Sequence, residues 1–123
     1  ELFFEDVRVP VENLLGGIEG QGFYQLMNQL PWERTMIGIT ALGAMDCGLQ
    51  LTIDYVRQRK AFDQPIMAFQ NTRFKLAEMK TKVEVTRSFI NDCVAKLIEV
   101  SLDPATALMV KYWGSQVQNE VLD

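Results

Sequence analysis

The 123-residue sequence contains no histidine, and this absence narrows the chemistry that its residues can carry. Without histidine, the segment cannot form a histidine-based triad or most kinds of zinc site, so we expect no metal centre. Its two cysteines, Cys47 and Cys93, form no Cys-x-x-Cys motif, and both lie in apolar runs. We therefore expect two reduced, buried thiols, as in proteins of reducing compartments.

Positive charge and long charge-free runs are also scarce. The sequence has 12 basic and 16 acidic residues, and a net charge of −4 argues against nucleic acid as the main partner. The two longest charge-free runs, Gly20–Trp32 and Thr35–Met45, are too short to cross a bilayer. No secretory signal peptide is recognisable. These features predict a protein without a membrane span.

The sequence does have strong helical periodicity. Leu30-Pro31-Trp32-Glu33-Arg34 opens a stretch that runs to about Lys60 and is apolar on nearly every side. Such a helix must be covered by other helices, by a partner subunit, or by both. Because Pro31 lacks an amide hydrogen, the short helix Gly22–Leu30 is expected to end or bend there, and a new helix to begin.

Two more helices follow a connector at Ala61–Ala68, whose turn residues are Asp63 and Pro65. In the first, roughly Phe69–Val100, apolar residues alternate spacings of three and four, which predicts the seam of an antiparallel bundle. Asp103-Pro104 marks the start of the last helix, which continues to at least Val121. This helix is expected to bury Ala105, Met109, Tyr112, Gln116 and Val117, or their neighbours.

The first residues have a different pattern. Apolar and charged residues interleave in Glu1–Pro10, which predicts a strand, and a glycine-rich connector follows to Gly22. One strand cannot form a sheet alone, so its partners are expected outside this segment. The fold class is therefore mainly α: an up-down antiparallel helical bundle (22–123, incomplete) preceded by the last strand and linker of a missing β domain (1–21).

Glu33 has two interpretations when judged from spacing alone. It lies near the third position of the helix expected to start at Pro31, where a carboxylate neutralises free amide groups and the helix dipole. It is also a candidate general base, and spacing favours the first role over the second. Tyr24 precedes Glu33 by nine residues, and a bend at Pro31 would bring it towards the same pocket, although core packing is the commoner role of a tyrosine.

Several short motifs follow one another along the whole chain: Phe4-Glu5-Asp6-Val7-Arg8-Val9-Pro10, Asn13-Leu14-Leu15-Gly16, Gly22-Phe23, Glu33-Arg34, Gln58-Arg59-Lys60-Ala61-Phe62, Phe69-Gln70 and Phe74-Lys75-Leu76-Ala77-Glu78-Met79. Together they resemble the acyl-CoA dehydrogenase family. The resemblance implies the end of the middle β domain followed by the C-terminal helical domain. The Glu33-Arg34 pair is similar to that of the branch that contains the long-chain and isovaleryl enzymes.

This family removes a proton from the carbon next to an acyl-CoA thioester and passes hydride from the following carbon to FAD, which yields a trans-2-enoyl-CoA. The resemblance implies that Glu33 is the base and that Tyr24 and Arg34 bind substrate. It also implies three cofactor-binding residues: Arg59 and Gln70, which reach the FAD of a neighbouring subunit, and Phe62, which packs near the same cofactor.

Two positions depart from the family pattern. Asp63 stands where the family usually has glycine, and a carboxylate there would repel a pyrophosphate unless it turned outward. Pro31 stands where some relatives have an aspartate that contacts substrate, so that contact is not expected.

The resemblance also implies a homodimer or homotetramer with electron-transfer flavoprotein as electron acceptor. The location would be the cytoplasm in a bacterium or the mitochondrial matrix in a eukaryote. The segment alone is expected to be inactive, because most of the flavin-binding β domain lies outside it. Two alternatives stay open: an inactive assembly or binding module of the same fold, and an acyl-CoA oxidase, which shares the half-reaction.

Overall fold

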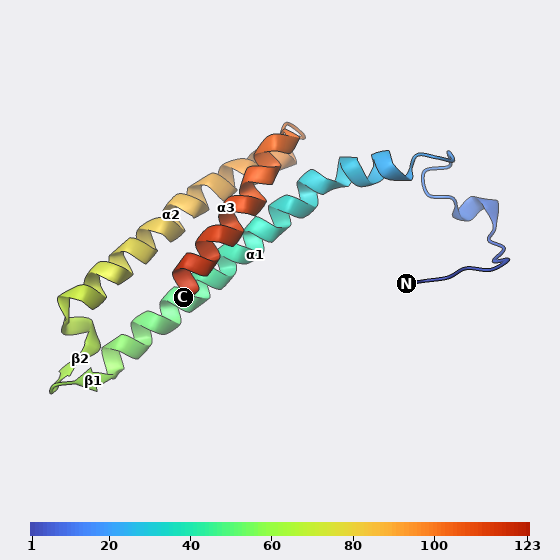
Figure 1. Ribbon diagram of the computed structural model, residues 1–123. Helices are drawn as coiled ribbons and strands as arrows, with labels where there is room; N and C mark the ends of the chain where they lie inside the picture. The colour runs from blue at the N-terminus through green and yellow to red at the C-terminus, as the bar shows by residue number, and fades with distance from the viewer.

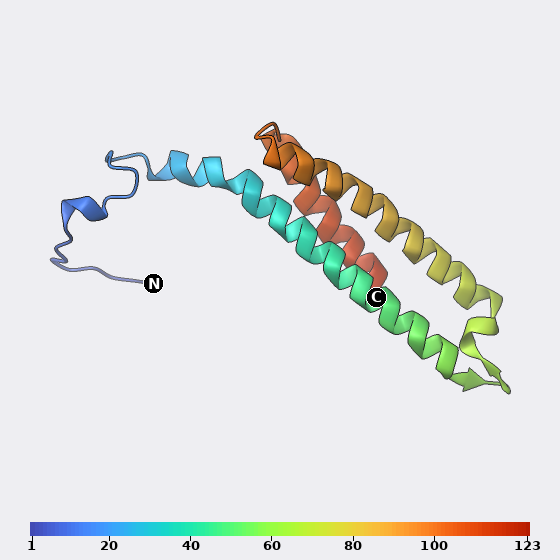
Figure 2. The same cartoon turned by 180° about the vertical axis from the view of Figure 1, so that it is seen from behind.

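The computed structural model describes the whole chain, Glu1 to Asp123, and is built around three long helices. Helix α1 spans Gly22–Gln58, α2 spans Gln70–Ile98 and α3 spans Pro104–Leu122. The chain runs down α1, back along α2 and down again along α3, as Figure 1 and the reverse view in Figure 2 show. The predicted fold, a mainly α, up-down antiparallel bundle, is confirmed. The short elements are η1 (Val11–Asn13), β1 (Lys60–Ala61), β2 (Gln64–Pro65) and η2 (Ile66–Ala68).

The core lies along the line where the three helices face each other. On α2 the buried residues follow the predicted three-and-four spacing: Leu76, Val83, Thr86, Ile90 and Cys93. They meet residues of α1 and α3 that are also enclosed, among them Met45 and Val117. The seam was expected to continue to Val100, but α2 ends at Ile98 and Val100 is exposed, with a left-handed φ of 56°.

Helix α3 turns a different face to the core from the one expected, except at Val117. Met109 and Tyr112 are exposed, and so are Ala105 and Gln116. The helix is centred instead on Gly114, which apolar periodicity overlooks because glycine has no side chain to count. The buried residues keep the three-and-four spacing in a shifted register: Ala107, Val110, Gly114, Val117 and Val121.

Helices α1 and α3 meet almost backbone to backbone at Gly38 and Gly114. A Cβ atom added to Gly114 would lie 3.2 Å from the Cα of Gly38, and one added to Gly38 would collide with the side chain of Val110. Two helices come this close only where neither carries a side chain at the crossing. The pair of glycines therefore sets the distance between α1 and α3.

Pro31 lies inside α1 rather than at the start of a new helix, so the predicted break is wrong. The helix does bend in this region: its first turns run at an angle to the rest (Figure 1). The missing amide leaves the carbonyl of Met27 without its helical donor. That loss is tolerated because Met27 is exposed, so water can reach this stretch of α1. Below the proline, the Thr35 hydroxyl donates to the carbonyl oxygen of Pro31 at 2.8 Å.

The strand predicted over Glu1–Pro10 is not formed. This segment is irregular and exposed, and it extends away from the bundle (Figures 1 and 2). A strand needs a neighbour to pair with, and the only paired strands in the chain are β1 and β2. The alternating pattern of these residues therefore has nothing to pair against here.

Helix α1 carries more apolar surface than α2 and α3 cover, as its composition predicted. Trp32 and Met36 are exposed just beyond Pro31, and Leu51 and Tyr55 are exposed near the end of the helix. By length and composition α1 could also cross a membrane, because the charge-free runs that are separately too short join into one helix. A core helix passes the same test, and α1 supplies Leu42, Met45, Leu49 and Val56 to the core.

The two cysteines have different environments. Both are free, as predicted, and Cys93 is fully buried in the seam of α2. Cys47 is exposed, so the prediction that it is buried is wrong. The sequence suggested burial because α1 is apolar on all sides, but only some of those sides face α2 or α3.

Candidate functional site

Glu33 lies well inside α1, which begins eleven residues earlier at Gly22. Its side chain is exposed and forms neither a hydrogen bond nor an ion pair with any other residue of the chain. The helix dipole acts on charges within the first turn only. Because α1 continues through Pro31, Glu33 has no helix terminus to neutralise, and the capping interpretation of this residue is wrong.

The residues predicted to bind substrate lie on the same stretch of α1. Arg34 follows Glu33 directly and is half-buried. Tyr24 is exposed, and its ring meets that of Phe23 edge to face with the centroids 5.9 Å apart. Nine residues of helix separate Tyr24 from Glu33, which is about 13 Å along the axis. The chain thus places these residues on one segment but does not enclose them in a common pocket.

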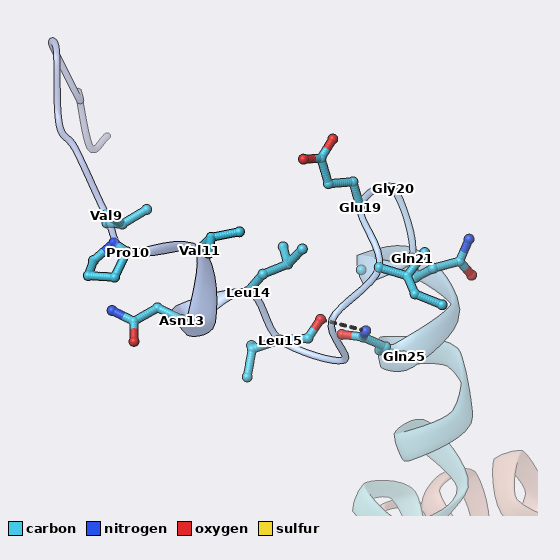
Figure 3. A pocket seen from close by; sticks show the side chains of 12 residues that line it. Val9, Pro10, Val11, Asn13, Leu14, Leu15, Glu19, Gly20, Gln21 and Gln25 are labelled. Atoms are coloured by element: carbon cyan, nitrogen blue, oxygen red, sulfur yellow. Dashed lines mark hydrogen bonds between the residues drawn. The ribbon is translucent and has the colours of Figure 1, made fainter.

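A hollow lies beside the start of α1, where Gln25 of this segment lines it (Figure 3). It has a volume of about 550 Å³, and its walls come from the irregular N-terminal segment and the first turn of α1. There the side chain of Gln25 donates to the carbonyl oxygen of Leu15 at 3.0 Å. Glu19 is the only ionisable residue that lines it. The hollow therefore holds no paired acid and base.

The second group of predicted site residues lies at the other end of α1, around the hairpin of β1 and β2. Lys60 pairs with Pro65 and Ala61 with Gln64, which leaves Phe62 as the first residue of a two-residue turn. The backbone φ is 53° at Phe62 and 62° at Asp63. Two consecutive left-handed residues define the type I′ turn that fits the twist of a hairpin.

The three residues predicted to reach FAD are brought together at this end. Arg59 caps α1, and its carbonyl oxygen accepts a hydrogen bond of 2.8 Å from the amide of Ile66, which closes the hairpin. Phe62 projects from the turn and is 91% exposed, with its ring 6.4 Å from that of Phe69. Gln70 is exposed at the first position of α2.

This end of the bundle is basic although the chain as a whole is acidic. Residues 57–75 include Arg57, Arg59, Lys60, Arg73 and Lys75, with Asp63 as the only acid. Of the five basic side chains, only that of Lys75 takes part in an ion pair. Unpaired guanidinium groups suit a phosphate or pyrophosphate, to which they donate in pairs. The residues present therefore fit a ligand with anionic phosphates and a planar ring, with Asp63 as the opposing charge.

The two groups of predicted site residues are far apart. Glu33 and Arg59 are separated by 26 residues, and at 1.5 Å per residue α1 places them about 39 Å apart. Glu33 and Arg59 of the same chain therefore lie too far apart to belong to one compact site.

Sequence reasoning overlooked two features of the hairpin end. Phe69 was considered only as part of a motif and as the first residue of a seam, whereas its ring contacts Phe62. The left-handed backbone at Phe62 and Asp63 was also unexpected. A two-residue loop between Ala61 and Gln64 would have indicated it, because such loops favour left-handed residues, but Phe-Asp is an unusual choice for them.

The decisive comparison is with a family model described as "Acyl-CoA dehydrogenase, C-terminal domain", which matches residues 20–123. The chain belongs to the acyl-CoA dehydrogenase family. The matched residues include all three helices and the hairpin, so the family resemblance of the motifs is confirmed.

Relatives within the family share extensive sequence with the chain. It is 48% identical over 121 residues to the mitochondrial long-chain specific acyl-CoA dehydrogenase of Rattus norvegicus, covering 98% of this chain and 28% of that protein. It is 43% identical over 90 residues to the mitochondrial isovaleryl-CoA dehydrogenase of Oryza sativa subsp. japonica, covering 73% and 22%. The chain thus spans between a fifth and a third of the length of these acyl-CoA dehydrogenases.

Solved structures of the family have the same fold. The crystal structure of acyl-CoA dehydrogenase from Geobacillus kaustophilus matches with a TM-score of 0.91 and 37% identity, over 97% of this chain and 31% of that chain. Butyryl-CoA dehydrogenase from Megasphaera elsdenii matches with a TM-score of 0.89 and 36% identity, over 96% and 30%. The bundle therefore matches the acyl-CoA dehydrogenase C-terminal helical domain.

Proposed function

We propose that residues 22–123 are part of the C-terminal helical domain of a flavin-dependent acyl-CoA dehydrogenase, and that 1–21 are the end of its middle domain and the linker between the two. The complete enzyme would convert a fatty acyl-CoA thioester to the trans-2-enoyl-CoA. Family membership and the identity to long-chain enzymes support this reaction. The observation that carries the proposal is Glu33: an exposed carboxylate inside a long helix, with neither an ion pair nor a helix end to explain it.

In this proposal Glu33 is the general base. Its carboxylate takes the proton from the carbon next to the thioester carbonyl, and the electrons of that C–H bond form the new double bond as hydride leaves the adjacent carbon. Bound FAD supplies the hydride acceptor. Arg34 and Tyr24 contact the substrate beside Glu33. The exposed apolar side chains of Trp32 and Met36 flank Glu33 in sequence and suit contact with an acyl chain, which would exclude water from the base.

The hairpin end would hold FAD of a neighbouring subunit. Arg59 presents a guanidinium fork for the pyrophosphate, Gln70 adds an amide donor and acceptor, and Phe62 offers an exposed ring. The separation of Glu33 from Arg59 supports this division between subunits. The apolar surface left uncovered on α1, including Leu51 and Tyr55, supports a homodimer or homotetramer. Electron-transfer flavoprotein is the proposed electron acceptor.

Replacement of Glu33 by glutamine tests the proposed base in the full-length enzyme. Glu33→Gln keeps the size of the side chain but cannot accept the proton. We expect it to retain FAD and to bind acyl-CoA, while reduction of the flavin by a saturated acyl-CoA slows by about 10²–10⁴-fold, the usual contribution of a general base. Stopped-flow absorbance of the flavin measures this rate. The matched control is Glu99→Gln, which alters an exposed, unpaired glutamate beyond the end of α2 and should bleach normally.

If the flavin of Glu33→Gln is reduced at the wild-type rate, Glu33 is not the base. The cofactor end has a separate test: Arg59→Ala should lower the fraction of FAD that survives gel filtration, and Arg59→Lys should restore it only in part, because a lysine lacks the paired donors. Full retention of FAD by Arg59→Ala would contradict the assignment of the hairpin end.

A further inference from the structure

We propose that Phe69 is a positioning residue: its ring holds the Phe62 ring in the projecting orientation that a bound planar group requires. The inference rests on the proposed function of the hairpin end, where Phe62 lies with Arg59 and Gln70. It adds to that function a residue that acts through another side chain and does not itself need to touch the cofactor.

The turn that carries Phe62 is strained. A left-handed backbone is rare for a residue with a bulky side chain, and Phe62 has a φ of 53°. The residue after it, Asp63, is also left-handed, at 62°. Turns of this type usually contain asparagine or glycine. A strained backbone persists only where surrounding contacts hold it, so the contacts of this turn decide where the ring points.

Few contacts are available to hold Phe62. The β1–β2 ladder fixes the residues on either side of the turn, and the hydrogen bond from Ile66 to Arg59 closes the hairpin. The Phe62 side chain is 91% exposed, so the bundle itself hardly packs against it. Its aromatic partner is Phe69, with the ring centroids 6.4 Å apart and the planes at 82°, an edge-to-face geometry that is attractive.

Phe69 is well placed to act as the fixed member of this pair. It is the N-cap of α2 and half-buried. Its amide donates to the carbonyl oxygen of Ile66 at 3.1 Å, and its own carbonyl oxygen accepts from the amide of Arg73 at 3.2 Å. The start of α2 thus anchors Phe69, while Phe62 remains accessible to a ligand. A ring that is already in place when the ligand arrives avoids the entropic cost of ordering it on binding.

A double-mutant cycle on FAD affinity tests this coupling in the full-length enzyme. Apoprotein is titrated with FAD, and the quenching of flavin fluorescence gives the dissociation constant for wild type, Phe69→Ala, Phe62→Ala and the double variant. We expect Phe69→Ala to weaken binding by about two- to tenfold, the equilibrium effect of one aromatic pair. In the Phe62→Ala background the same substitution should have no further effect, because its target is absent.

Two further variants separate the ring contact from general packing. Phe69→Leu keeps apolar volume but removes the aromatic edge, so it should weaken FAD binding by about the same two- to tenfold, and it keeps the test available if Phe69→Ala unfolds. Phe74→Ala removes an exposed phenylalanine of α2 that has no aromatic partner, and it should bind FAD as wild type does.

The outcomes distinguish failure of the inference from failure of the proposed function. If Phe62→Ala binds FAD normally, Phe62 takes no part in FAD binding and the inference fails, while the cofactor end itself fails only if Arg59→Ala also retains FAD fully. If Phe62→Ala is weak but Phe69→Leu is normal, only the positioning role is overturned. It is also overturned if Phe69→Leu weakens binding equally in both backgrounds, because Phe69 would then act independently of Phe62.

Discussion

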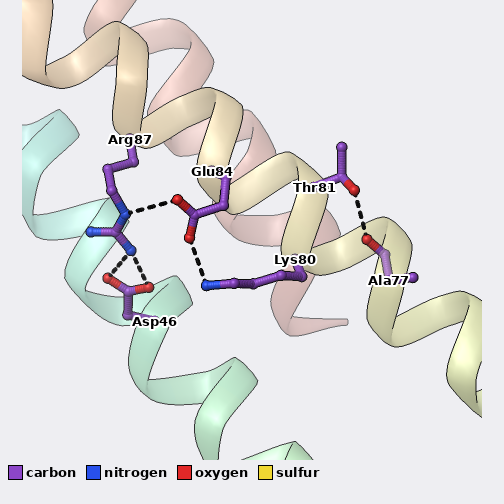
Figure 4. A network of polar contacts seen from close by, with 6 residues as sticks. All are labelled: Asp46, Ala77, Lys80, Thr81, Glu84 and Arg87. Carbon is purple, nitrogen blue, oxygen red and sulfur yellow. Dashed lines mark hydrogen bonds and ion pairs between the residues drawn. The ribbon is translucent and has the colours of Figure 1, made fainter.

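Asp46 on α1 and Arg87 on α2 form the only ion pair between these two helices. One guanidinium nitrogen, Nη2, donates to both carboxylate oxygens, at 2.7 Å in the case of Oδ2 (Figure 4). Glu84 approaches the same guanidinium, with its Oε2 3.5 Å from Nε, and also pairs with Lys80. The hydrogen bond to Asp46 raises the pKa of Arg87 above its ordinary value. The four side chains form a polar network along the outer edge of the α1–α2 contact.

This network should contribute little to stability. Asp46 and Arg87 are 41% and 34% exposed, so water screens their attraction. We expect Asp46→Asn to lower the free energy of unfolding by about 0.2–1 kcal/mol, and less at high salt, as denaturant titrations at two salt concentrations would show. A loss above about 3 kcal/mol would instead indicate a desolvated pair.

Because α1 and α3 are in close contact at Gly38, alanine substitutions at two glycines of α1 should change the free energy of unfolding in opposite directions. Gly38→Ala places a methyl group against the side chain of Val110, and we expect a net loss of about 1–3 kcal/mol from the forced separation of the helices. Gly43→Ala is the matched control, since a Cβ there meets nothing within 4 Å. It should gain up to about 1 kcal/mol from helix propensity. Denaturant unfolding measures both, and equal effects would contradict the crossing.

The start of α3 should show a pH-dependent cap. The Asp103 carboxylate accepts hydrogen bonds from the Thr106 hydroxyl and from the Thr106 amide, the latter at 2.9 Å, and these bonds lower the pKa of Asp103. Its contribution is therefore complete above the unfolded pKa, about 3.8, and is lost as the pH falls through the lower folded value.

Two substitutions of Asp103 test the cap. We expect Asp103→Ala to melt at a lower temperature than wild type at pH 7, and the gap to close on acidification below pH 3.8. Asp103→Asn still caps but does not titrate, so its melting temperature should exceed that of Asp103→Ala at every pH. If the difference in melting temperature between wild type and Asp103→Ala is the same at pH 7 and pH 2, the ionised form of Asp103 is not what stabilises the start of α3.

The thiols should differ sharply in reactivity. Cys47 is exposed, whereas Cys93 is fully buried and burial raises the pKa of its thiol. Only a thiolate reacts, so we expect a disulfide reagent to modify one thiol rapidly and the second only on unfolding. Cys47→Ser should remove the fast reaction and Cys93→Ser should keep it. Rapid modification of both thiols in the native protein would contradict the buried seam of α2.

Periodicity predicted the helices of this chain well and their boundaries less well. The seam of α2 followed from its spacing, because each buried residue carries an apolar side chain or a threonine. The face of α3 did not, because its centre is Gly114, whose importance comes from its contact with Gly38 on another helix. A contact between two residues that lack side chains leaves no apolar signal in either segment.

The candidate site shows the same limit. The local rule for proline predicted a helix start at Pro31, and this gave Glu33 a capping role that the continuous α1 removes. The motifs singled out residues of the hairpin end, but the sequence predicted a connector there, and neither the hairpin nor the left-handed pair at Phe62 and Asp63 was expected. Local preference favours glycine or asparagine there, so the observed backbone reflects the constraint of the two flanking strands. The assignments of Glu33 and Arg59 to catalysis and cofactor binding remain predictions.

The length of α1 has a genetic consequence. If a reaction centre takes Glu33 from one chain and Arg59 from its neighbour, two variant genes with different defects can complement each other. A symmetric pair formed from one Glu33→Gln subunit and one Arg59→Ala subunit contains one centre with both defects and one with neither. Cells that express both defective variants should therefore show more dehydrogenation than cells that express either one alone, because the length of α1 places the two residues of one chain in two different reaction centres.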